Sequence, residues 1–122
     1  MGSALRKELH RLWMTCVWSW AGWKSSWKSE ASLRHWTRMN LASILLACIL
    51  DLTHLERALI IALGLIVLVV ELVNTAIEKA VDHTSTDESK LAESAKDAGS
   101  AAVALMAITA GIVWIFLIVN LF

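Results

Sequence analysis

The chain has 122 residues, is 57% hydrophobic, and carries 11 basic and 11 acidic residues, so its formal net charge is zero. A mean hydropathy of +0.61 is too apolar for an ordinary soluble domain of this size. There is no Pro to interrupt helices, and the apolar runs are continuous rather than alternating, which argues against a β fold. We therefore predict a single all-α membrane domain over residues 1–122, with no nucleic-acid partner.

Residues 4–28 are predicted to form an amphipathic helix on the membrane surface. Apolar residues recur at steps of three and four, and five of the seven Trp residues lie between positions 13 and 27. Arg and Lys residues supply the charge, as is typical of a helix that lies in the membrane interface. A soluble amphipathic helix docked on a protein core is the alternative interpretation.

Three apolar stretches follow, and we predict transmembrane helices at about 33–50, 58–77 and 98–120. The first is long enough only if Arg34 and Arg38 snorkel toward the surface. A short polar turn is expected at 51–57, and the loop between the last two helices is expected at 85–89. The third stretch opens with a run of small residues at 98–102, which permits close approach of another helix.

The distribution of Lys and Arg predicts the topology. Residues 1–38 hold seven of the eleven basic residues, residues 78–97 hold three, and the 51–57 turn holds one. The positive-inside rule therefore places the N-terminus and the 78–97 loop in the cytoplasm, and the C-terminus on the periplasmic side. This topology brings six charged residues toward the cytoplasmic face: Glu30, Glu71, Glu78, Asp82, Lys96 and Asp97.

An acidic stripe marks the end of the second span. Glu71, Asn74, Glu78 and Asp82 fall within an arc of about 80° on one helix face. A carboxylate at the edge of hydrocarbon is costly and usually functional. Carboxylates with a Lys suit Mg²⁺ and phosphate, and thus phosphoryl transfer to a lipid hydroxyl. Spacing alone leaves two alternatives open, a structural polar seam between helices and an ion or proton pathway.

The sequence lacks the phosphate-binding loops that soluble nucleotide-binding proteins use. The five Gly residues are scattered, and they form neither a P-loop nor a kinase Gly-rich loop. Cys16 and Cys48 lack metal-ligand spacing and are expected to be free thiols. Taken alone, Glu30 could simply be an ion-pair partner of Arg34, one turn later. Trp114 is expected to be an ordinary packing or interfacial residue.

Three segments resemble the prokaryotic integral-membrane diacylglycerol kinases, a family of small three-helix lipid kinases. They are Trp20 to Arg34 (WAGWKSSWKSEASLR), Glu71 to Asp82 (ELVNTAIEKAVD) and Lys96 to Val103 (KDAGSAAV). The patterns E-x-x-N-x-A-I-E-x-x-V-D and A-K-D-x-G-S-A-A-V are highly specific together. The resemblance covers nearly the whole chain from about Arg11. It implies ATP-dependent phosphorylation of diacylglycerol to phosphatidic acid with Mg²⁺, at the bacterial inner membrane.

The resemblance also implies roles for individual residues. Glu71 is expected to be the general base and Asn74 to orient it, while Glu30 and Glu78 hold the metal of MgATP. The residues expected to bind ATP are Arg11, Trp18, Glu30, Glu78, Asp82, Asp87, Lys96 and Asp97. Those expected near the lipid substrate are Arg11, Trp20, Trp27, Arg34, Glu71 and Ser100.

The chain departs from the family pattern at several positions. Trp18 stands where some relatives have Tyr, and Ala21 replaces a common Lys. Asp87-Glu88-Ser89 stands where the family often has E-Y-H. A related branch resembles undecaprenol kinases, so that lipid is an alternative substrate. A non-enzymatic membrane adaptor or ion-conducting oligomer is the alternative of a different class.

We also predict a homotrimer, because three spans and one surface helix are too few to enclose a lipid, ATP and metal ions. The small residues at 98–102 would let the third helices pack closely between subunits.

Overall fold

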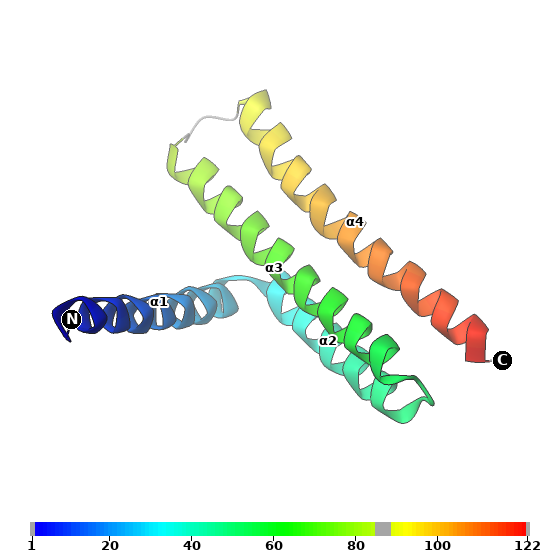
Figure 1. Cartoon of the computed structure of the whole chain (residues 1–122). Helices are drawn as coiled ribbons and strands as arrows, with labels where there is room; N and C mark the ends of the chain where they lie inside the picture. Colours follow the sequence, from blue (N-terminus) through cyan, green and yellow to red (C-terminus); the bar gives the residue numbers. More distant parts are fainter. Residues whose placement is uncertain (1, 85–88, 122) are drawn as a thin grey trace. The chain divides into compact units, whose positions relative to one another are not determined.

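The computed structural model describes residues 2–84 and 89–121, with side chains from Ala4 onward. Its described residues form four helices and no strand: α1 (Gly2–Ser29), α2 (Ala31–Ile49), α3 (His54–Thr84) and α4 (Lys90–Leu121) (Figure 1). The chain divides into two compact units, residues 1–31 and residues 32–122. The loop predicted at 85–89 lies outside the described residues, apart from Ser89.

The N-terminal unit consists of α1, which was predicted over 4–28. Its large apolar side chains are mostly exposed: Leu5, Leu9, Leu12, Trp13, Trp18 and Trp20. Trp23 and Trp27 stack on each other with ring centroids 6.1 Å apart, as their spacing of one helical turn allows. The exposed Trp and Leu side chains support the prediction of a surface helix, because an interface helix needs an uncovered apolar face.

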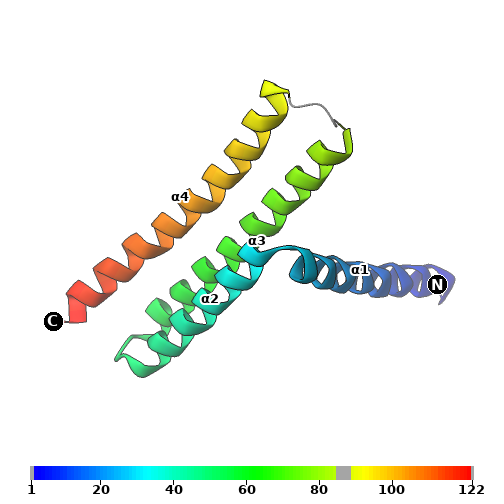
Figure 2. The same ribbon diagram turned by 180° about the vertical axis from the view of Figure 1, so that it is seen from behind.

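The C-terminal unit holds α2, α3 and α4. The two views agree that α3 and α4 run side by side in opposite directions (Figures 1 and 2). A single face of α3 is buried, at positions that repeat every three or four residues: Ile60, Gly64, Val67, Leu68, Glu71, Asn74 and Thr75. This spacing is that of one helical stripe, so the apolar residues before Glu71 and the polar residues after it share one buried face.

Hydrogen bonds fix the turn between α2 and α3. Thr53 and Glu56 form a capping box: Thr53 N and Oγ1 donate to Glu56 Oε2 at 2.8 and 2.7 Å, and Glu56 N donates to Thr53 Oγ1 at 3.3 Å. Arg57 donates to the carbonyl oxygens of Ala47 and Leu52, at 2.9 and 3.2 Å. Because the capping box starts α3 at His54, the turn is shorter than the predicted 51–57.

A small apolar cluster packs behind this turn. Its buried residues are Ala47, Leu52 and Ile60, and the α4 residues Val113, Trp114 and Leu117 pack against them. Trp114 Nε1 also donates to Ser43 Oγ of α2, at 2.8 Å. Trp114 is therefore a packing residue, as predicted, and the cluster ties all three helices of the unit together.

Within the described residues, α3 and α4 are long and apolar enough to cross a membrane. Both extend beyond the predicted spans, since the helices continue through the polar segments at 78–84 and 90–97. Many large apolar side chains of α4 are exposed, including Leu105, Ile115 and Phe116. The fold agrees with the predicted all-α membrane class, while a third span by α2 and a homotrimer stay predictions.

Candidate functional site

The buried face of α3 turns from apolar to polar at Glu71. Glu71 and Thr75 are each 3% exposed, and Asn74 is 7% exposed. Burial of an ionisable carboxylate among apolar residues costs free energy unless the group is paired or has a function. This part of the helix was the centre of the sequence prediction, and the structure places it in the interior of the C-terminal unit.

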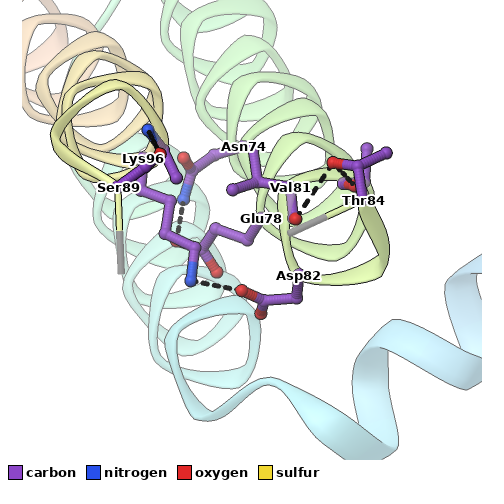
Figure 3. A network of polar contacts seen from close by, with 9 residues as sticks. Asn74, Glu78, Val81, Asp82, Thr84, Ser89 and Lys96 are labelled. Atoms are coloured by element: carbon purple, nitrogen blue, oxygen red, sulfur yellow. Dashed lines mark hydrogen bonds and ion pairs between the residues drawn. The ribbon is translucent and has the colours of Figure 1, made fainter. Parts of the chain in front are cut away.

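Asn74 is held in a fixed orientation between two neighbours. Its Nδ2 donates to Glu78 Oε1 at 2.9 Å, across one turn of α3 (Figure 3). Its Oδ1 is buried and has no hydrogen-bond partner among the residues that the structure describes. That oxygen lies against α4, where a Cβ added at Gly99 would overlap it. Asn74 therefore orients the carboxylate of Glu78 and keeps one buried amide oxygen unbonded.

A cross-helix ion pair lies at the outer end of the stripe. Lys96 Nζ of α4 lies 2.5 Å from Asp82 Oδ1 of α3, with side chains 39% and 64% exposed (Figure 3). The hydrogen bond to Asp82 raises the pKa of Lys96 above its ordinary value; desolvation lowers it, and the charges of Asp82 and Glu78 raise it further. Lys96 precedes the predicted span at 98–120 and is cationic at neutral pH.

The stripe separates its groups by depth along α3. At a rise of about 1.5 Å per residue, Glu71 and Asp82 lie roughly 16 Å apart along the helix axis. Glu71 is nearest the apolar residues, Glu78 is half-buried, and Asp82 is exposed. One helix face therefore presents a buried carboxylate, an oriented carboxylate and an exposed ion pair, in that order.

The other predicted residues of the C-terminal unit lie at its surface or edge. Asp97 and Ser100 of α4 are exposed, and Arg34 of α2 is half-buried. Asp87 lies outside the described residues.

The remaining predicted residues belong to the N-terminal unit. Arg11 Nη1 pairs with Glu8 Oε1 at 3.1 Å, and Glu30 Oε1 accepts a hydrogen bond from Ser29 Oγ at 2.7 Å. Trp18, Trp20 and Trp27 also lie on α1. The structure brings Asn74 to Glu78 and Asp82 to Lys96 within the C-terminal unit.

The donor atoms of the site fit a magnesium ion that arrives with phosphate. Mg²⁺ takes oxygen ligands and commonly binds through one or two carboxylates plus substrate phosphate oxygens. Glu78 offers such a carboxylate, oriented by Asn74 and half-buried. Among the residues that the structure describes, no three His, Cys, Asp or Glu side chains converge to hold an ion by themselves. The free thiols predicted at Cys16 and Cys48 are confirmed.

Three features of the site were not predicted. The Asp82–Lys96 ion pair, the packing of Asn74 against Gly99, and the cap of α4 all depend on contacts between residues that were considered separately. Ser89 Oγ accepts from Ala92 N at 3.1 Å, which is an N-cap. The signal for this cap was present, since Ser89 directly precedes the helical segment. The two contacts between α3 and α4 could not be predicted in this way, because they depend on how α4 is rotated about its axis relative to α3.

Comparison with known proteins places the candidate site within a matched region. Residues 17–118 match the family model for prokaryotic diacylglycerol kinase. The chain is 38% identical over 100 residues to the diacylglycerol kinase of Escherichia coli K12, with 82% of each chain covered. It is 43% identical over 103 residues to that of Pseudomonas aeruginosa, covering 83% of this chain and 84% of the relative. It is also 38% identical over 108 residues to the diacylglycerol kinase of Helicobacter pylori 26695, and this alignment covers 88% of this chain and 84% of the relative.

Proposed function

Because the chain belongs to the prokaryotic diacylglycerol kinase family, we propose that it transfers the γ-phosphoryl group of ATP to the free hydroxyl of diacylglycerol. The products are phosphatidic acid and ADP. The observation that carries this proposal is the buried carboxylate of Glu71, 3% exposed, on the same helix face as the oriented Glu78 and the ion-paired Asp82. Phosphoryl transfer to a lipid needs an acceptor for the hydroxyl proton beside apolar surroundings, and phosphate-binding groups beside water.

Glu71 is the proposed general base. It takes the proton of the lipid hydroxyl while the hydroxyl oxygen forms a bond to the γ-phosphorus and the bond from that phosphorus to the ADP oxygen breaks. The residues that precede Glu71 on this face of α3 include Ile60, Val67 and Leu68, and their apolar character is what a lipid site requires. The proposed reaction is a direct transfer from nucleotide to lipid, without a covalent enzyme intermediate.

The outer groups of the stripe are proposed to hold MgATP. Glu78, with Glu30, would bind the metal, and the amide of Asn74 keeps the Glu78 carboxylate oriented. Mg²⁺ bound with ATP would neutralise charge on the phosphate oxygens. Lys96 is cationic and provides a point charge for phosphate, while Asp82 holds its ammonium group in place.

Further residues complete the proposed site. Asp97, Arg11, Trp18 and Asp87 are proposed on the nucleotide side. The lipid side is proposed to include Arg34, Ser100, Trp20, Trp27 and Arg11. We propose three membrane spans in the bacterial inner membrane, with the N-terminus and the 78–97 segment in the cytoplasm, where ATP is available. A homotrimer would supply the enclosure that a single chain of four helices lacks.

One assay tests this function. Purified protein is incubated in mixed micelles with γ-labelled ATP, Mg²⁺ and one lipid at a time, and the lipid fraction is counted. Labelled phosphatidic acid from diacylglycerol, with much less product from undecaprenol or a sphingoid base, is the expected result. If undecaprenol were the preferred acceptor, the protein would be an undecaprenol kinase, which is the alternative within the same family. The absence of labelled product from every lipid would exclude the kinase proposal and favour a non-enzymatic membrane role.

A further inference from the structure

A cavity of about 210 Å³ lies between α2, α3 and α4 of the C-terminal unit. Its walls are formed largely by apolar side chains and small residues, including Met39, Ile60, Val67, Ala107, Gly111 and Trp114. Apolar cavities of about 150 Å³ in other proteins stay dry and take up small apolar molecules. The size therefore suffices for a segment of an apolar ligand.

Two of the polar side chains in the wall already donate hydrogen bonds within the protein. Asn40 Nδ2 donates to the carbonyl oxygen of Gly64 at 2.5 Å, and Trp114 Nε1 donates to Ser43 Oγ at 2.8 Å. Within the described residues, the buried side-chain atom without a hydrogen-bond partner is Oδ1 of Asn74, which is not part of the wall. A polar ligand would lose its hydration among mainly apolar walls, so the cavity favours an apolar one.

The cavity continues the buried face of α3 that carries Glu71. Val67 lies one turn before Glu71, and Ile60 three turns before it, so the cavity begins about 6 Å and ends roughly 16 Å from Glu71 along the helix. A lipid that presents its hydroxyl to Glu71 has its acyl chains directed into the apolar part of the membrane. The cavity lies in that direction, at the depth of the middle of a long chain.

We propose that this cavity binds one acyl chain of the lipid substrate and sets the preferred chain length. The inference rests on the proposed function, since it assumes that the lipid hydroxyl meets Glu71. Gly64 and Asn40 shape one side of the cavity. A Cβ added at Gly64 would overlap Asn40 Oδ1, so a glycine at this position allows Asn40 to approach and donate its hydrogen bond to the Gly64 carbonyl oxygen. The deep end of the cavity determines how far a chain can extend.

Gly111 offers a direct way to shorten the cavity. A Cβ added at Gly111 meets nothing within 4 Å, so the first carbon of a larger side chain there enters open space. Replacement of a helical glycine also raises helix propensity, which favours folding of the variant. Gly111→Leu is expected to lower kcat/KM for dioleoylglycerol by roughly tenfold or more relative to dihexanoylglycerol, whose short chains do not reach the deep end.

Thr109→Leu is the matched control. Thr109 lies at nearly the same depth on α4 and, like Gly111, is exposed, but it lies outside the cavity wall, with its hydroxyl bonded to the carbonyl of Leu105. This variant should keep the wild-type ratio of the two substrates. An equal fall with both lipids in Gly111→Leu, accompanied by a change in oligomeric state, would instead assign the cavity to a contact between subunits and overturn the proposal.

A second measurement does not depend on turnover. A long-chain diacylglycerol with a diazirine in the distal half of one acyl chain is photolysed with the protein, and labelled residues are mapped by mass spectrometry. Labelling within residues 107–114, reduced by Gly111→Leu, is expected. Labelling elsewhere would overturn the acyl site. A wild-type protein that takes up the label here but phosphorylates no diacylglycerol would contradict the proposed function and leave this cavity as a lipid-binding site.

Discussion

At the start of α3, Arg57 donates to two backbone carbonyl oxygens and Glu56 closes a capping box with Thr53, so the polar groups there hold the turn together. Toward the other end of the same helix, Glu71 is buried and Asn74 keeps an unbonded carbonyl oxygen. Polar groups that serve folding are satisfied by the chain itself, because an unsatisfied buried group costs free energy. A carboxylate that remains buried among apolar residues is better explained by a function than by stability.

The contrast between the two ends predicts that they respond differently to mutation. Changes near the α2–α3 turn should lower stability and leave the activity of the folded fraction intact. Changes on the stripe from Glu71 to Asp82 should act mainly on catalysis or nucleotide binding, and the exposed ion pair should in addition contribute slightly to stability.

The largest effect is expected for Glu71→Gln. The amide is nearly isosteric but cannot accept the hydroxyl proton, so kcat should fall by about 10²- to 10⁴-fold. Thermal unfolding in detergent should change little. Glu56→Gln is the matched control on the same helix, and its kcat should stay near wild type. A Glu71→Gln enzyme with near-normal kcat would remove Glu71 as the base and erase the contrast between the two ends.

Glu78→Gln tests the next group outward. Gln can still accept the hydrogen bond from Asn74 Nδ2, so the local geometry should persist. Loss of the negative charge is expected to raise the KM for MgATP roughly 10- to 100-fold, since bonds to charged groups contribute about 1.5–3 kcal/mol. The measurement is the initial rate against MgATP at saturating lipid. An unchanged KM with a large fall in kcat would assign Glu78 to proton transfer instead of metal binding.

Arg57→Leu tests the start of α3, where the polar groups are expected to stabilise the fold. It removes two hydrogen bonds and leaves the carbonyl oxygens of Ala47 and Leu52 without this partner, which should lower the free energy of unfolding by about 2 kcal/mol. Specific activity of the folded fraction should stay within about twofold. Arg57→Lys should lose less, because Lys can still reach one carbonyl. A stable Arg57→Leu protein with strongly reduced kcat would place Arg57 in the catalytic machinery and contradict the comparison.

The sequence was sufficient for the helices and for the stripe. Long apolar runs without Pro predict helices, and the spacing of Glu71, Asn74 and Glu78 places them on one face, because both signals are local. Their burial could be expected from the apolar residues that precede them. The turn was predicted too long, because residues 51–57 were taken together as one polar turn although the T-x-x-E spacing of Thr53 and Glu56 is that of a capping box.

The partners across helices could not be predicted in the same way. Lys96 of α4 pairs with Asp82 of α3, 14 positions earlier in the chain, and within the described residues it does not pair with its neighbour Asp97. The choice depends on how α4 is rotated against α3, and that rotation is limited by the close approach of Gly99 to Asn74. Likewise, Asn40 and Ser43 were evident as polar residues in an apolar span, but their partners Gly64 and Trp114 lie on other helices.

The smallest effect is expected for Asp82→Asn, at the exposed end of the stripe. Asp82 raises the pKa of Lys96 above 10.5, so the pair stabilises the fold below about that pH and loses its effect as pH rises through the higher folded-state pKa. The variant should therefore show a slightly lower Tm than wild type at pH 7, and the difference should vanish in strongly alkaline buffer. Exposed ion pairs contribute little, so the shift should be small. Asp51→Asn, at an exposed residue of the α2–α3 turn, is the control and should show no such pH-dependent difference. A difference that persists at high pH would mean that Asp82 stabilises α3 independently of the Lys96 charge.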